Sequence, residues 1–307
     1  MAANTLNLSV AGPISAAVDR VRLVLFQPFD LEKWLTLGFC AFLANLGHGG
    51  GGGGGGHWGG HGGDLHVQPM VEWIESNLAW VVFGALGIGV VVLALMLLFA
   101  WLSSRGEFMF VDGVVRNRAA VKEPWAVYAQ SGNRLFLFTF LLWLALSLFV
   151  GITLGSSLAW AWPDIQADRF GDRSLVAIIC GIGVLFPTLL GSWIAHVVLR
   201  DFVVPAMYLR PQPVLAAFSS VWEEVMRPHL GIVVLYFIVK ILLGLVIGLL
   251  AVIVTCLTCC LAALPYIGTV ILLPLLAFKR SFSLCFLQQF GPAWDCFASA
   301  PSTAQTH

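Results

Sequence analysis

Two long apolar runs in the last third of the chain constrain the fold more than any other feature. They cover 231–261 and 264–280, with Pro265 where the chain must reverse. About 20 consecutive apolar residues cross a bilayer, and a soluble core has little use for a longer run. Lys279 and Arg280 then end the second run with two positive charges. The pattern predicts two membrane spans joined by a tight turn.

The composition of the whole chain also indicates a membrane protein. Hydrophobic residues make up 59% of its 307 residues and charged residues only 10%, which excludes an ordinary soluble domain. We expect an all-α integral membrane protein with six transmembrane helices and short amphipathic cytoplasmic helices. We expect no cleavable signal peptide, because the first residues carry charges without a compact apolar stretch. The predicted spans cover 34–47, 78–102, 135–159, 174–198, 231–261 and 264–280. The first is short, so a re-entrant half-helix is the alternative to a span.

The predicted membrane domain covers 34–292, between a cytoplasmic amphipathic segment at 1–33 and a cytoplasmic tail at 293–307. Apolar residues recur at helical spacing over 13–26, which predicts a helix lying on the membrane surface. Eight consecutive glycines within 48–68 predict a disordered loop, because ordering glycine costs much backbone entropy.

The distribution of Lys and Arg predicts the orientation. Thirteen of the sixteen lie on one side of the predicted spans, and only Arg169 and Arg173 lie on the other. Cytoplasmic loops carry the excess of positive charge, so we expect both termini in the cytoplasm and a location in the inner (plasma) membrane. The net charge is zero, and we expect membrane lipids, a membrane protein partner or a second copy as partners, and no nucleic acid.

Each even-numbered span ends in a basic residue followed closely by an aromatic one. The three segments are Arg105-Gly106-Glu107-Phe108, Arg200-Asp201-Phe202 and Arg280-Ser281-Phe282. Three repeated helical hairpins explain this similarity, and chance likeness among amphipathic segments explains it equally well.

Several motifs spread over nearly the whole chain resemble those of an uncharacterised bacterial family of six-span membrane proteins. They are LPYIGTV at 264–270, SFSL at 281–284, FLQQFGP at 286–292, PFDLEKWL at 28–35 and RDFVVPAMY at 200–208. The family is distantly similar to the membrane domain of some glycerophosphodiester phosphodiesterases. The resemblance implies the six-span fold and no established activity. We do not expect phosphodiesterase activity, because the sequence contains no such catalytic domain.

Lys240 is the one charged residue well inside an apolar run. An ionisable group within a membrane is a functional candidate with an expected partner, here Asp201 or Glu107. The alternative is that Lys240 lies at the cytoplasmic interface and extends its ammonium group into water, with the span starting at Ile241.

Two groups of residues are candidate metal ligands. Histidines in the glycine-rich segment suit zinc, copper or nickel, but flexible glycine does not hold ligands in place. Three cysteines at helical spacing suit a soft metal, although cysteine is also a small apolar packing residue. We therefore expect no metal and no cofactor. The residues in question are His57, His61, His66, Cys256, Cys259 and Cys260.

The sequence thus favours a non-enzymatic membrane protein that binds lipid or a membrane partner in envelope organisation. The alternative is a small transporter or channel that uses Lys240 and helices kinked at Pro187 and Pro274. A membrane enzyme is a third class, for which Asp201, Glu107 and Arg200 are the only plausible set.

Overall fold

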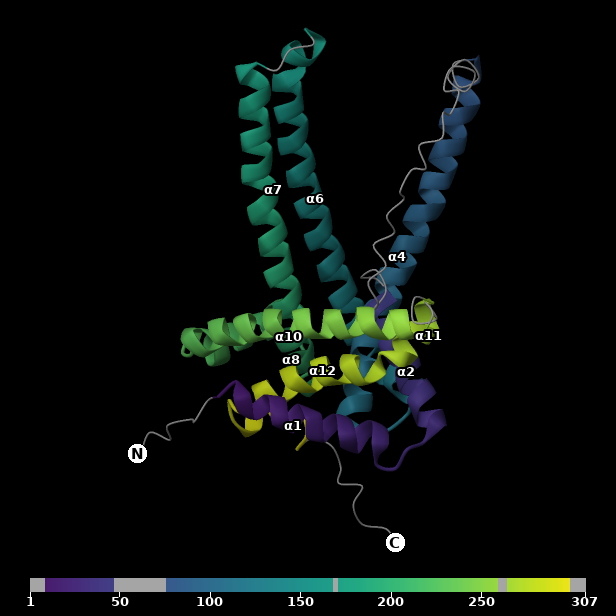
Figure 1. Ribbon diagram of the computed structural model, residues 1–307, viewed down its shortest axis with the longest axis vertical. Helices are drawn as coiled ribbons and strands as arrows, with labels where there is room; N and C mark the ends of the chain where they lie inside the picture. The colour runs from purple at the N-terminus through teal and green to yellow at the C-terminus, as the bar shows by residue number, and fades with distance from the viewer. Residues whose placement is uncertain (1–8, 47–75, 168–170, 259–263, 299–307) are drawn as a thin grey trace.

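The computed structural model describes residues 9–46, 76–167, 171–258 and 264–298 (Figure 1). All the regular elements in these ranges are helices, as the apolar runs and helical spacings predict. In chain order they are α1 (Ala11–Val21), η1 (Arg22–Phe26), α2 (Leu31–Leu46), α4 (Leu78–Arg116), α5 (Lys122–Val127), α6 (Ala129–Gln166), α7 (Asp172–Val198), η2 (Leu199–Val203), α8 (Val204–Leu209), α9 (Val214–Val221), η3 (Trp222–Met226), α10 (Leu230–Leu257), α11 (Pro265–Ile271), α12 (Leu273–Gln288) and η5 (Pro292–Trp294).

Four helices in the described residues are long and apolar enough to cross a membrane. They are Leu78–Arg116, Ala129–Asp164, Asp172–Leu209 and Leu230–Leu257. The third is one continuous helix, in which α7 passes through the π-helical turn η2 into α8. Long apolar helices that leave their side chains uncovered are typical of a protein embedded in lipid. The chain is therefore an all-α protein of membrane type.

The structure does not support six spans. The predicted span 34–47 falls in α2, which has 16 residues and buries Leu37, Ala41 and Ala44 inside the protein. The predicted span 264–280 is divided between α11 and α12, and the second half of α12 is buried. Hydropathy alone does not distinguish an apolar helix covered by protein from one covered by lipid, which is why both runs were predicted to be spans.

Three of the long helices stand as arms above a packed region. Figure 1 shows α4, α6 and α7 rising from one end of the molecule, with α6 alongside α7. In α4, no residue from Leu78 to Leu102 is buried, whereas almost all residues from Ser103 to Val115 are. The arms therefore present apolar surface to the membrane, and their lower ends lie inside the packed region.

The packed region, which we call the base, contains the hydrophobic core. It consists of α1, η1, α2, η2, α8, α9, η3, α12 and residues 103–115 of α4. Large buried side chains such as Phe108, Phe202, Tyr236 and Phe286 meet there from distant parts of the sequence. The amphipathic helix α1 packs along α12 and buries Ala17, so its apolar face contacts protein rather than the membrane surface.

The predicted hairpins differ in their packing. Helix α2 packs along α4, and α6 packs along α7, as two helical hairpins would. Helix α10 instead lies across the molecule between the arms and the base (Figure 1). It buries only Val233 and Tyr236, so almost its whole apolar length is uncovered.

Candidate functional site

The candidate site begins with a carboxylate buried in the core of the base. Glu107, on α4, is 2% exposed and forms ion pairs with Arg200 of η2 and Arg280 of α12. Arg280 also donates from Nη1 to the carbonyl oxygen of Arg200 at 2.7 Å. Arg200 donates from Nη2 to the carbonyl oxygen of Ala44 at 3.1 Å. One carboxylate thus joins three helices that are far apart in the sequence.

A second ion pair lies beside the first. Lys240 of α10 forms an ion pair with Asp201, whose Oδ2 also accepts a hydrogen bond from the Tyr236 hydroxyl at 2.8 Å. The Lys240 side chain is 11% exposed, so its ammonium group lies inside the protein and does not extend into water. Lys240 and Tyr236 are four residues apart on α10, which places both on one face of the helix.

The π-helical turn η2 connects the two ion pairs. Its neighbouring residues Arg200 and Asp201 carry opposite charges and bind different partners, Glu107 and Lys240. Single π-helical turns inside α-helices are frequent at functional sites, because the wider turn redirects side chains. The motif RDFVVPAMY thus supplies one charge to each half of the network.

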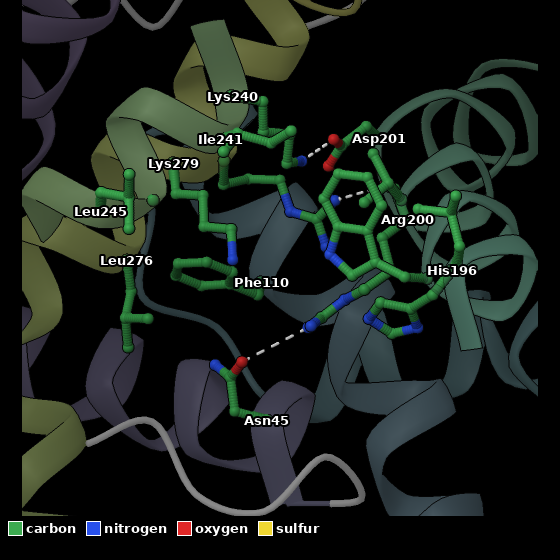
Figure 2. Close-up of a pocket in the computed structure, with 15 residues that line it drawn as sticks. Asn45, Phe110, His196, Arg200, Asp201, Lys240, Ile241, Leu245, Leu276 and Lys279 are labelled. Atoms are coloured by element: carbon green, nitrogen blue, oxygen red, sulfur yellow. Dashed lines mark hydrogen bonds and ion pairs between the residues drawn. The ribbon is translucent and has the colours of Figure 1, made fainter. Parts of the chain in front are cut away.

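A cavity of about 560 Å³ opens next to these ion pairs. It is lined by the polar or charged residues Asn45, His196, Arg200, Asp201, Lys240, Lys279 and Arg280, by the apolar residues Phe110, Leu190, Trp193, Val197, Ile241, Leu245 and Leu276, and by Gly244. Figure 2 shows Lys279 extending into the cavity beside Phe110. The cavity therefore combines positively charged side chains with apolar side chains from α4, α7, α10 and α12.

The three sequence candidates Asp201, Glu107 and Arg200 do come together in the base. Both carboxylates form ion pairs with buried or partly buried cations, so each has a structural role in the base. Arg280 and Tyr236 belong to the same network and were not candidates. The signal for Arg280 was present in the repeated basic and aromatic segments, but Tyr236 is an ordinary aromatic residue within an apolar run.

A separate buried carboxylate was also missed by the sequence reasoning. Asp112 is fully buried on α4 and accepts a hydrogen bond from the Tyr208 hydroxyl at 3.1 Å. Arg116 and Arg118 form ion pairs with it, each at 3.1 Å. Both carboxylate oxygens of Asp112 thus have partners, and the bond from Tyr208 fixes the end of α4 against α8.

The structure gives no support to the metal-ligand candidates. His57, His61, His66, Cys259 and Cys260 lie outside the described residues. Cys256 is exposed on α10. Within the ranges that the structure describes, no group of three or more His, Cys, Asp or Glu residues is placed to hold a metal ion.

The thiols of Cys285 and Cys296 are buried in the base. Burial raises the pKa of Cys285 to about 11 and that of Cys296 to about 12. The thiolate is the reactive form, so both thiols stay protonated and unreactive at neutral pH. We expect mass spectrometry to find neither residue modified by iodoacetamide in the folded protein, and both modified after denaturation in SDS. Equal modification in the two states would mean that the base does not cover them.

Comparison with known proteins gives one match. A model described as a family of unknown function (DUF7544) matches residues 8–293. No curated protein and no solved structure matches the chain. The match shows no link to the glycerophosphodiester phosphodiesterase membrane domain, so that part of the resemblance is not supported. Because the match covers nearly the whole length, the chain belongs to this family of unknown function, DUF7544.

Proposed function

We propose that this is a non-enzymatic, multi-pass protein of the bacterial inner membrane that holds a membrane lipid in the cavity beside Lys240, as part of envelope organisation. The cavity itself is the observation that carries the proposal. Its volume of about 560 Å³ lies within the usual range of ligand pockets, roughly 300–1,000 Å³. Its wall includes Leu190, Ile241 and Leu245, which belong to helices that leave their other faces to the membrane.

The proposed orientation places the base and both termini in the cytoplasm. Nearly all described Lys and Arg residues belong to the base or lie close to it, whereas Arg173 lies near the far end of the α6–α7 hairpin (Figure 1). Positive charge accumulates on the cytoplasmic side of membrane proteins, which supports this orientation. The cavity then lies at the cytoplasmic boundary of the bilayer, where lipid head groups are found.

The test is native mass spectrometry of the protein extracted in lipid nanodiscs. We expect one retained lipid per chain, and we expect it to be lost when Gly244→Trp fills the cavity. The control is Gly248→Trp on the same helix, because both glycines have open space around them and only Gly244 lines the cavity. Lipid retention that is equal in both variants would place any bound lipid elsewhere and would contradict the proposal.

A small transporter or channel is the second candidate. The observation in its favour is the Lys240–Asp201 ion pair, because a charged pair at a cavity between apolar helices is typical of a transport pathway. Flux into proteoliposomes that disappears in the Lys240→Leu variant would support this candidate. Retention of a lipid by that variant, without any flux, would favour the lipid-binding proposal instead.

A further inference from the structure

We propose that the cavity recognises a phosphate-bearing lipid head group, with Lys279 and Arg200 as its contact residues. This inference rests on the proposed lipid-binding function and names the chemistry of the ligand. Three observations carry it, namely the charge balance of the cavity, the unused hydrogen-bond donors and the apolar wall.

The first observation is an excess of positive charge. Four cationic side chains line the cavity, and they are Arg200, Lys240, Lys279 and Arg280. Two carboxylates, Asp201 and Glu107, are bound to them, which leaves two positive charges without a counter-charge among these groups. Uncompensated charge in a partly enclosed apolar setting is costly, so the cavity favours an anion.

The second observation is that donors remain available on the cavity side. Lys279 is exposed, extends into the cavity, and has no hydrogen bond or ion pair with any described residue. The side-chain contacts of Arg200 with the described residues are all made through Nη2, and its Nε and Nη1 make no hydrogen bond to a described residue. A phosphate group, with several oxygen acceptors and at least one negative charge, matches an ammonium group beside a guanidinium group.

The third observation favours a lipid as the source of the phosphate. The cavity of about 560 Å³ is much larger than a phosphate ion, and half of its lining is apolar. Trp193 lies on this wall at the lower end of α7, just before His196 and Arg200. Tryptophan is enriched at the depth of the head groups, and basic pockets between helices on the cytoplasmic side bind anionic head groups. The acyl chains then extend along α7 into the bilayer.

The experiment compares lipid retention in nanodiscs that contain equal amounts of phosphatidic acid and phosphatidylcholine. Native mass spectrometry measures the ratio of the two lipids bound to the chain. We expect the wild-type protein to retain phosphatidic acid at least about tenfold more often, because charge-assisted hydrogen bonds are the strong ones. Lys279→Gln should reduce this ratio about tenfold, and Lys279→Arg should restore it.

The matched control is Lys122→Gln, since Lys122 is an exposed lysine on α5 outside the cavity. It should leave the lipid ratio unchanged, and a similar fall in this variant would reduce the effect to general surface charge and overturn the inference. A bound lipid with no preference for phosphatidic acid would also overturn it, while leaving the proposed lipid binding intact. Absence of any bound lipid would overturn both.

A second arm separates lipid from free phosphate. Detergent-purified protein is titrated with inorganic phosphate, and the midpoint of thermal unfolding is followed. We expect millimolar phosphate to raise the midpoint little, and short-chain phosphatidic acid to raise it at far lower concentration in wild type but not in Lys279→Gln. Equal stabilisation by inorganic phosphate, with no additional effect of the lipid, would assign the site to a free anion and overturn the lipid source.

Discussion

Glu107→Gln is expected to lower the free energy of unfolding by about 3–5 kcal/mol, which is the usual cost of removing one partner from a buried ion pair. The carboxylate of Glu107 is shared by Arg200 and Arg280, and Arg280 is 6% exposed. Glutamine keeps the shape of the side chain, but it leaves the buried guanidinium group of Arg280 and the partly buried one of Arg200 without their counter-charge. The free energy is measured by unfolding the purified protein in mixed micelles with increasing SDS.

The matched control is Glu123→Gln, which removes a carboxylate from Arg118 at an exposed position. An exposed ion pair contributes only about 0–1 kcal/mol, so this variant should unfold close to wild type. The double variant Glu107→Gln/Arg280→Gln should recover part of the loss, because one unpaired charge is also removed. A Glu107→Gln protein as stable as the Glu123→Gln protein would show that the ion network does not hold the base together.

Gly106→Ala is expected to be the second highly destabilising change, with a loss of about 2–3 kcal/mol, at the upper end of overpacking effects. A Cβ atom at Gly106 would lie 2.5 Å from the backbone nitrogen of Ala44 and 2.6 Å from the backbone carbon of Leu43. Backbone atoms of α2 cannot rotate away as the end of a side chain can. The two helices must therefore separate, which also disturbs the contacts of the neighbouring Glu107.

Gly89→Ala is the matched control for this change, because it lies on the same helix and a Cβ atom there meets nothing within 4 Å. Alanine favours a helix over glycine by about 1 kcal/mol, so the control should be neutral or slightly stabilising. The two substitutions add the same methyl group, but only Gly106→Ala should lower the resistance to SDS unfolding. Similar stability of both variants would contradict the close contact between α2 and α4.

The sequence identified part of the ion network because charges are rare in apolar runs. Lys240 stood out for that reason, and Asp201 and Glu107 were its two named partners; the structure pairs it with Asp201. The partners of Glu107, which are Arg200 and Arg280, depend on how α7 and α12 are arranged around α4. That arrangement comes from core packing between segments far apart in the chain, and no periodicity within one helix encodes it.

The all-helical nature of the fold followed directly from composition and run length, whereas the number of spans did not. An apolar side chain packs equally well against lipid and against protein. The composition of α2 and of the α11–α12 segment therefore matched that of spans, although protein covers much of them. The close approach at Gly106 helps to explain the difference, because it lets α2 pack against α4. A single glycine in a membrane helix is too common to indicate such a contact.

The three-way bond at Glu107 also has a consequence for the order of events during translation. Arg280 lies 173 residues after Glu107, within α12. When α4 leaves the ribosome, Glu107 has neither of its two basic partners. Arg200 is synthesised first and Arg280 later. Only a chain translated as far as α12 supplies both partners of this carboxylate. Assembly of the base is therefore a late step in biogenesis, completed when α12 is in place.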